Sequence, residues 1–489
     1  MKARFIKNTI YFGIGNALNR LVSFVLIPIY TKYLSQAEYG LLEIAFSTVL
    51  FLEIFLGLGF DKSLIRYYQD YKRQNLEGQI LSTTLFAPIA AFVILLALGF
   101  AFAGLISDRL FKQQGHQDLV YLILLLSFFR VVGHQFTSFY RASANGFKFI
   151  LFYAFIFAFV VVLNTIIVIY CGGGISAILM TYIAAFLLIS AAIMVKDYRI
   201  SLRDFSFPLA RQSFYFGFPL VLSMVSWFAL RTADRYFLLH FRDLNEVAVY
   251  GLAFRMVSVI QFLIIAPFQL SYPPHVFSLE DGDKRRAFIA STFLPLFVIL
   301  ASAGLLLCTT AKHLVLFLAT PEYVGSARVA TWLVPSIVLS GLYYWSAIIF
   351  HVTGKTRIIS SVVGVVACMT LVLNYFLVPR YGVVGTAISA NLSSAVIFFA
   401  LLAISRKHLT IPIHNRRKVI ACAVLVLAVF LGLLVLNAYE MPTVLQLVLL
   451  AGYFLALYKL NLIQKSAFMQ IVAMIRRKMH LKALKTRMT

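Results

Sequence analysis

Charged residues are scarce in this sequence of 489 residues, and acidic residues are the scarcest. Charged side chains make up 12% of the chain and hydrophobic side chains 61%, whereas an ordinary soluble domain has about 25% charged residues. No polar stretch between hydrophobic runs is long enough to form a soluble domain. The composition therefore excludes an ordinary globular enzyme and indicates a polytopic membrane protein, because each apolar run of about 20 residues can span a bilayer.

Cysteine and the motifs of cofactor chemistry are also scarce. The four cysteines all fall inside apolar runs and no C-x-x-C spacing occurs, which argues against a disulfide framework or a zinc site. No ATP-binding motif, catalytic triad or metal-ligand cluster is present. We therefore expect no enzymatic activity, no cofactor and no metal.

Basic residues exceed acidic ones by 43 to 18, a net charge of +25. In a soluble protein this excess would suggest nucleic acid, but in a membrane protein it is typical of cytoplasmic loops. With the N-terminus placed in the cytoplasm, 31 of the 43 basic residues fall on the cytoplasmic side, seven in outer loops and five inside spans. The sequence thus predicts cytoplasmic N- and C-termini, an even number of spans and no nucleic-acid partner.

Hydrophobic runs bounded by charged, glycine or proline clusters define the expected spans. Fourteen fit the sequence, and the chain is therefore predicted to be an all-α membrane protein. The expected spans are residues 9–30, 40–60, 80–106, 118–140, 149–171, 173–195, 213–240, 247–272, 287–311, 327–352, 358–379, 382–405, 418–437 and 442–461.

Short motifs recur at offsets of 204 to 211 residues and indicate an internal repeat. Tyr11-Phe12-Gly13 matches Tyr215-Phe216-Gly217, and Leu163-Asn164 matches Leu373-Asn374. An even number of spans separates the copies, so the halves are predicted to be parallel repeats related by an axis along the membrane normal. We expect two six-helix lobes, residues 1–195 and 212–405, around a central cavity.

Three further segments complete the predicted organisation. Residues 196–211 form a basic cytoplasmic linker between the lobes, and residues 406–463 hold two additional transmembrane helices, the thirteenth and fourteenth. Residues 464–489 form a basic cytoplasmic tail. Its apolar residues recur at helical spacing, which suits an amphipathic helix on anionic lipid headgroups; a disordered basic tail is the equal alternative.

Five arginines lie inside the predicted spans, and each costs about 2.5–3.5 kcal/mol at a helix centre on insertion scales. Helical periodicity groups them with other polar residues. Arg231, Asp234 and Arg235, spaced i, i+3, i+4, are predicted to share one face of the seventh span. The candidate substrate-binding residues of a central cavity are Asn16, Asn19 and Arg20 in span 1, Arg130 and His134 in span 4, Arg231, Asp234 and Arg235 in span 7, and Arg255 in span 8.

Only three acids, Glu43, Glu53 and Asp234, lie inside the spans, so surplus arginine is expected in the cavity. Arginine forks match phosphate oxygens, which favours a large anionic polar substrate. Asp234 is expected to pair with Arg231 or Arg235. The alternative is that the arginines snorkel or form interhelical salt bridges. His134 could carry protons, although a packing histidine is the simpler interpretation.

Two segments resemble the Wzx-type polysaccharide flippases of the multidrug/oligosaccharidyl-lipid/polysaccharide exporter superfamily, and the likeness covers both lobes. The residues that carry it are Asn16, Asn19, Pro28, Tyr30, Lys32, Leu34, Glu38-Tyr39-Gly40, Gly57-x-Gly59 and Arg66, and then Asn374, Pro379, Tyr381-Gly382-Val383 and Gly385-Thr386-Ala387. The resemblance implies alternating access and a lipid-linked oligosaccharide cargo, usually on undecaprenyl diphosphate. Members often have twelve spans, whereas fourteen is the number in lipid II flippases.

The expected function is therefore a flippase that moves a polyprenyl-diphosphate-linked oligosaccharide from the cytoplasmic to the outer leaflet for surface polysaccharide biosynthesis, such as O-antigen of lipopolysaccharide. The expected location is the cell (inner) membrane. Its expected partners are this glycolipid, membrane lipids and other polysaccharide assembly proteins, with an ion or proton as coupling candidate. The alternatives are an ion-coupled antiporter of organic cations, a lipid II-type flippase, and a membrane glycosyltransferase or polymerase, for which the outer loops are too short.

Overall fold

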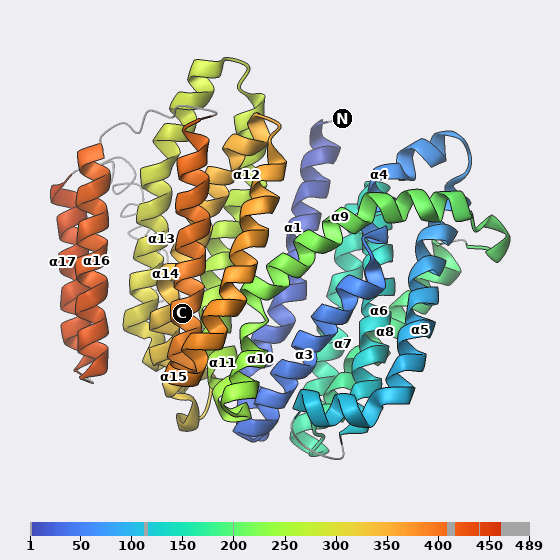
Figure 1. Cartoon of the computed structure of the whole chain (residues 1–489), viewed down its shortest axis with the longest axis horizontal. Helices are drawn as coiled ribbons and strands as arrows, with labels where there is room; N and C mark the ends of the chain where they lie inside the picture. Colours follow the sequence, from blue (N-terminus) through green and yellow to red (C-terminus); the bar gives the residue numbers. More distant parts are fainter. Residues whose placement is uncertain (1, 112–115, 199, 408–415, 440, 461–489) are drawn as a thin grey trace, which may run out of the picture. The chain divides into compact units, whose positions relative to one another are not determined.

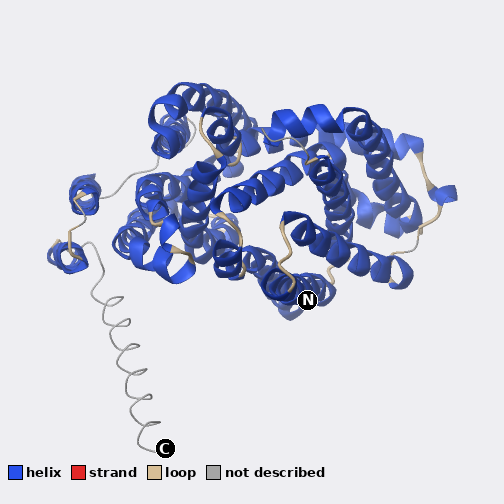
Figure 2. Cartoon of the chain, turned by 90° about the horizontal axis from the view of Figure 1, so that it is seen from below, coloured by secondary structure: helices blue, strands red, loops and turns tan. Residues whose placement is uncertain are grey.

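The described part of the chain is helical throughout. The computed structural model describes residues 2–111, 116–198, 200–407, 416–439 and 441–460, and these residues form helices and connecting turns without a strand (Figures 1 and 2). A helix satisfies its backbone hydrogen bonds internally, as a segment in lipid must. The prediction of an all-α membrane protein is confirmed.

Eight α-helices precede the predicted linker. They are α1 Lys2–Val25, α2 Ile27–Tyr33, α3 Gln36–Gly57, α4 Phe60–Arg73, α5 Glu77–Phe111, α6 Gln117–Ala142, α7 Gly146–Tyr170 and α8 Ile175–Lys196. The start of α3 shows how local sequence sets a helix end. The Ser35 hydroxyl accepts a hydrogen bond from the Glu38 amide, and the Glu38 carboxylate accepts one from the Ser35 amide, a reciprocal cap that pairs two amides left free at the helix end.

The second part of the chain repeats this series with more interruptions. Its elements are η1 Leu202–Asp204, α9 Phe207–Arg231, α10 Asp234–Phe241, α11 Leu244–Ile260, the π-helical turn η2 Gln261–Ile265, α12 Ala266–Ser278, α13 Gly282–Leu318, η3 Pro321–Tyr323, α14 Gly325–Val352, α15 Thr356–Ser405, α16 Arg416–Ala438 and α17 Thr443–Lys459.

The number of membrane-crossing helices is smaller than the predicted number of spans. Among the described residues, twelve helices are long and apolar enough to cross a membrane, and α17 is a shorter apolar helix of 17 residues. One of the twelve is α15, whose 50 residues include Gly382 in a non-helical conformation (φ 53°, ψ −133°). The count of fourteen stays a prediction, because it treats α15 as two spans and α17 as one.

Helix boundaries recur at the offset of the sequence repeat. The starts of α3 and α11 are 208 residues apart, those of α5 and α13 are 205 apart, and those of α7 and α15 are 210 apart. The repeat is also visible where helices end early: α1 stops at Val25 and α9 at Arg231, and each is followed by a short helix. Duplicated sequence thus gives duplicated local structure.

The predicted seventh span, residues 213–240, is not one helix. Thr232 departs from helical geometry (φ −137°, ψ −30°), so that α9 ends at Arg231 and α10 begins at Asp234. The expectation that Arg231, Asp234 and Arg235 share one face of a continuous helix is therefore wrong. The sequence shows no glycine or proline at the break, so helical periodicity alone could not detect it.

The described structure divides into two compact units. Among the described residues, the first contains those of 2–256, 313–329 and 360–393, and the second contains those of 257–312, 330–359 and 394–460. In the second unit, the Tyr453 hydroxyl of α17 lies 3.1 Å from Ser302 Oγ of α13, and Gln446 donates to the Asn437 side chain of α16. The predicted lobes 1–195 and 212–405 stay a prediction, and the predicted tail helix lies outside the described residues.

A close approach of two glycines fixes the crossing of α4 and α9 in the first unit. Leu58 and Gly59, between α3 and α4, both have positive φ, and a Cβ on Gly59 would lie 2.7 Å from the Cα of Gly217. Gly217 belongs to the motif that the repeat duplicates. Only residues without a side chain allow backbones to come this close.

Candidate functional site

The candidate residues of α1 lie on an accessible surface. Asn16, Asn19 and Arg20 are all exposed, and their spacing places them on one face of the helix. Ser23, one turn further along, uses its side chain locally and donates to the Arg20 carbonyl. The structure therefore exposes three polar side chains of span 1.

A buried ionic network lies where α3, α10 and α11 meet, and we call its five members, Glu43, Asp234, Arg235, Tyr250 and Arg255, the Glu43 network. Glu43 of α3 forms a salt bridge with Arg255 of α11, and its other oxygen lies 3.4 Å from Nε of Arg235 in α10. The exposed fractions of the Glu43 and Arg235 side chains are 6% and 7%. One carboxylate thus binds two guanidinium groups away from solvent.

Asp234 completes the network on the side of α10. Its Oδ1 lies 3.3 Å from Nη1 of Arg235 and accepts a hydrogen bond from the Arg235 amide, while its Oδ2 accepts one from the Tyr250 hydroxyl. Asp234 was expected to pair with Arg231 or Arg235, and the structure shows the pair with Arg235. Two carboxylates and two guanidinium groups give the network no net charge.

Aromatic rings and backbone carbonyls surround the two arginines of the network. The Arg235 guanidinium lies 5.0 Å from the ring centre of Phe254, and that of Arg255 lies 5.6 Å from the ring centre of Tyr39. Arg255 also donates to the Ser23 carbonyl of α1, and Arg235 to the Arg231 carbonyl. Hydrogen bonds to carbonyls and contact with ring faces offset the cost of burying a charge.

A second buried carboxylate on α3 binds α6. Glu53 forms a salt bridge with Arg130, and its other oxygen lies 3.5 Å from Nε2 of His134. Arg130 and His134 are one helical turn apart on α6, as the sequence predicted, and His134 is the most exposed member, with 38% of its side chain accessible. This cluster joins two helices of the first half of the chain.

Arg231 has a different environment from the other candidate residues of span 7. It is the last residue of α9, half-buried, and its guanidinium lies 4.9 Å from the ring centre of Trp227. The break at Thr232 puts it on a different helix from Asp234 and Arg235, but its carbonyl accepts a hydrogen bond from the Arg235 guanidinium, 3.1 Å away. The structure therefore assembles Asp234, Arg235 and Arg255 into one group with Glu43, and Arg130 and His134 into another with Glu53.

Sequence reasoning missed the central role of Glu43 and the contribution of Tyr250. From the sequence, Glu43 is recognised as an acid inside a span, but no particular arginine is assigned as its partner. The available signal was its rarity: an ionisable residue at membrane depth needs a partner. Tyr250-Gly251 repeats Tyr39-Gly40 at an offset of 211 residues, and nothing in that repeated Tyr-Gly pair indicates a hydrogen bond from Tyr250 to Asp234.

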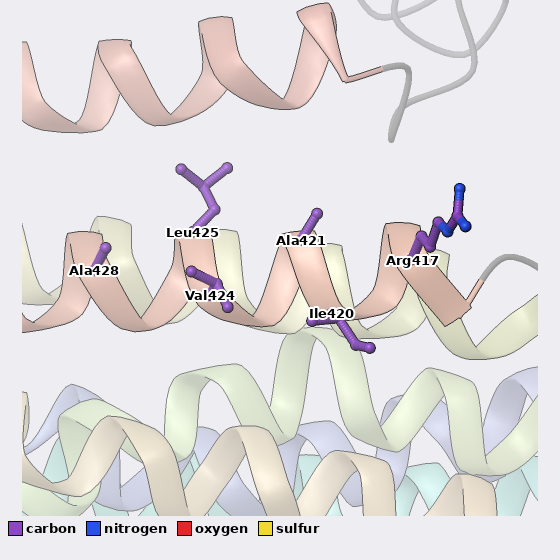
Figure 3. A pocket seen from close by; sticks show the side chains of 6 residues that line it. All are labelled: Arg417, Ile420, Ala421, Val424, Leu425 and Ala428. Carbon is purple, nitrogen blue, oxygen red and sulfur yellow. The ribbon is translucent and has the colours of Figure 1, made fainter.

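A surface pocket elsewhere has none of these features. It has a volume of about 570 Å³ and its lining residues all belong to α16, namely Arg417, Ile420, Ala421, Val424, Leu425 and Ala428 (Figure 3). Five of the six are apolar and the single charge lies at the start of the helix. Such a surface suits contact with lipid better than recognition of a polar cargo.

Comparison with known protein families identifies the family of this chain. A family model described as polysaccharide biosynthesis protein matches residues 5–280. The chain belongs to this family. A relative with 21% identity over 423 residues, covering 79% of this chain and 81% of its own length, is an uncharacterized membrane protein of Methanocaldococcus jannaschii.

Solved structures show the fold of this family member. The lipid II flippase MurJ in an inward closed conformation matches with a TM-score of 0.71 and 16% identity, over 92% of this chain and 98% of MurJ. An inward-facing multidrug resistance MATE transporter of the MOP superfamily matches with a TM-score of 0.65 and 15% identity, over 81% and 98%. A MOP superfamily transporter from Pyrococcus furiosus matches with a TM-score of 0.54 and 16% identity, over 83% and 96%.

The family model confirms the expected family, and the solved structures confirm its fold. The protein is a multi-pass membrane protein of the polysaccharide biosynthesis family with the fold of the MurJ and MATE structures.

Proposed function

We propose that this protein flips a polyprenyl-diphosphate-linked oligosaccharide from the cytoplasmic to the outer leaflet of the cell membrane by alternating access, as a step in cell-surface polysaccharide biosynthesis. The observation that carries the proposal is the engagement of the membrane carboxylates. Glu43, Glu53 and Asp234, the three acids inside the predicted spans, each bind an arginine. An organic cation would find these carboxylates already neutralised, which argues against a cation antiporter.

The cargo chemistry follows from the accessible polar groups. Exposed Asn16, Asn19 and Arg20 on α1 offer amide and guanidinium donors, and half-buried Arg231 offers a further guanidinium. A diphosphate accepts several charge-assisted hydrogen bonds from such groups. We propose Arg20, Arg130, Arg231, Arg235 and Arg255 as its ligands, in one cavity site with Asn16, Asn19, His134 and Asp234.

A lipid II-type cargo is the second candidate, and the likeness to MurJ over 92% of the chain favours it. Both candidates share the polyprenyl diphosphate and differ in the glycan. Other polysaccharide assembly proteins and a coupling ion or proton remain proposed partners, and an inner-membrane location with cytoplasmic termini remains the proposed topology.

Transport into proteoliposomes tests the proposal. Purified protein is reconstituted with a fluorescent polyprenyl-diphosphate oligosaccharide in one sample and with fluorescent lipid II in another, and movement between leaflets is followed with a membrane-impermeant quencher. We expect faster movement of at least one glycolipid than in protein-free vesicles. Uptake of an organic cation without movement of either glycolipid would refute the flippase and support the antiporter.

A further inference from the structure

The Glu43 network joins helices from the two halves of the sequence repeat. Glu43 lies on α3 of the first half, whereas Arg235 and Arg255 lie on α10 and α11 of the second half. Arg255 reaches further and donates to the Ser23 carbonyl of α1, 3.0 Å away. All of these residues belong to the same compact unit. One carboxylate therefore holds two second-half helices to the first half.

Other residues at helix ends near this network also pack closely against each other. Thr31 of α2 donates to the Leu318 carbonyl at the end of α13, at 3.1 Å, and the rings of Tyr39 and Tyr323 meet edge to face at 5.8 Å. Thr31, Tyr39 and Tyr323 are almost completely buried. Thr31 belongs to α2 and Leu318 ends α13, while Tyr39 lies in the first turn of α3 and Tyr323 in η3. In Figure 1 the start of α3 and the helices α10 and α11 lie at the end of this unit that faces away from the N-terminus of α1, which is the outer end in the predicted orientation.

Glu53 provides an internal comparison on the same helix. It is a buried carboxylate of α3 that also binds an arginine, but both of its partners lie on α6. Its ion pair therefore connects two helices of the first half only. If the halves move relative to each other during transport, the Glu53 pair can persist, whereas the Glu43 pairs cannot.

We propose that Glu43 is a latch that keeps this end of the transporter closed, and that release of Arg235 and Arg255 from its carboxylate is an obligatory step in opening it. The proposal rests on the proposed function only in assuming a transport cycle. It adds a specific interaction that has to break, between named atoms of α3, α10 and α11.

Ion pairs are suited to such a reversible closure. A buried pair gives little net stabilisation, because the desolvation of both charges offsets much of their attraction. When the helices separate and water enters, the same charges are hydrated, so the open state is also accessible. The network carries no net charge, so closing it leaves no uncompensated ion in the interior. The equilibrium between the two states can therefore be shifted by a cargo or by a single substitution.

Cysteine accessibility at position 31 tests the latch without any glycan. Cys171, Cys308, Cys368 and Cys422 are replaced by serine, and Thr31→Cys is introduced as the reporter, because Thr31 is 2% exposed in the closed arrangement. The protein is placed in nanodiscs so that a hydrophilic maleimide reaches both faces. The labelling rate of the thiol introduced at position 31 then reports how often this end opens.

Glu43→Gln is the test variant and Glu53→Gln the matched control, since each removes one buried carboxylate from α3. We expect Glu43→Gln to raise the labelling rate about tenfold, which corresponds to a shift of about 1.4 kcal/mol in the opening equilibrium, and Glu53→Gln to leave it within about twofold of the parent. Equal rates for Glu43→Gln and the parent would overturn the latch. Equal acceleration by both variants would overturn it too, because it would indicate general loosening.

A double variant covers the case in which Glu43→Gln misfolds because its arginines are left unpaired. Glu43→Gln with Arg255→Gln removes one charge of each sign, so the remaining Asp234 and Arg235 still balance. We expect this variant to unfold at nearly the parent temperature and yet to label rapidly. Protection equal to that of the parent would contradict the proposal. Because labelling needs no cargo, a failed latch and a failed flippase assignment are separate outcomes.

Discussion

The carboxylate of Glu43 lies directly against the backbone of Gly251, so that a Cβ at position 251 would stand 2.8 Å from both Cγ and Cδ of Glu43. Gly251 follows Tyr250, which donates to Asp234 in the same network. The absence of a side chain at position 251 is therefore what lets α11 approach α3 closely enough for Arg255 to reach Glu43. In the second half of the chain, the close packing of α11 against α3 therefore explains the glycine of the repeated Tyr-Gly pair.

Replacing Gly251 by alanine should disturb the ionic network. The new Cβ would overlap the Glu43 side chain, and overpacking of this kind costs about 1–3 kcal/mol. We expect a lower unfolding temperature in detergent and faster labelling of the thiol introduced by Thr31→Cys. Gly364→Ala is the control, because the nearest atom to its added Cβ, Ser226 Oγ, is 3.9 Å away. A Gly251→Ala protein as stable as this control would contradict the role assigned to the close approach.

The duplicated Tyr-Phe-Gly motif offers a matched pair of glycine substitutions. A Cβ on Gly217 would lie 3.1 Å from the Cα of Gly59 and closer still to the Leu58 carbonyl, whereas a Cβ on Gly13 meets nothing within 4 Å. We expect Gly217→Ala to lower the unfolding temperature. Gly13→Ala should leave it unchanged or raise it, since alanine favours a helix interior over glycine by about 1 kcal/mol. Thermal unfolding followed by intrinsic fluorescence compares the two, and equal losses would be the contrary result.

Asp197, just after α8, should make stability depend on pH. Partial burial raises the pKa of its carboxyl, but the salt bridge with Lys148 and the hydrogen bond from Tyr140 outweigh burial and hold the pKa below its usual value. A lowered pKa in the folded state means that the carboxylate stabilises the protein above its ordinary pKa of about 3.9 and that this contribution disappears as the pH falls through the lowered value. Asp197→Asn should therefore unfold at a lower temperature than the parent at pH 7, and the difference should shrink below about pH 4. A constant difference across this range would show that charge is not the cause.

Arg20 should matter for transport and little for stability. It is exposed on α1, and substitutions at exposed positions usually change stability by less than about 0.5 kcal/mol. We expect Arg20→Ala to be present in the membrane at the parent level and to move the glycolipid at least about tenfold more slowly, the effect of losing roughly 1.4 kcal/mol of binding. Arg20→Lys should recover part of the rate, because it keeps the charge but loses the bidentate fork. Normal transport by Arg20→Ala would remove Arg20 from the proposed site.

The helices were largely predictable because their signal is local. Apolar runs bounded by charges and glycines located helices close to the observed α3, α7 and α16, and the repeat offset anticipated the paired helix boundaries. The break at Thr232 was not predictable in this way. Neither glycine nor proline marks it, and both flanking segments are apolar enough to continue a helix, so contacts with other helices have to decide where α9 ends.

The candidate site was predictable in composition but not in pairing. Periodicity correctly placed Arg130 and His134 one turn apart, and rarity correctly singled out Glu43 and Glu53 as acids that require partners. Sequence reasoning could not assign those partners, because Glu43 and Arg235 are 192 residues apart in the chain.

The sequence by itself determined that this chain enters a membrane, which segments are helical and that two copies of one helix series follow each other, since hydrophobicity and repetition are properties of the chain alone. Tertiary structure decided which charges neutralise each other. The sequence suggests Arg235 and Arg255 as cargo ligands, yet α3 brings Glu43 within reach of both, and Glu43 and Arg235 are buried. A charge in a low-dielectric interior takes the nearest opposite charge that the packing allows, and only the packing of α3 against α10 and α11 specifies which one that is.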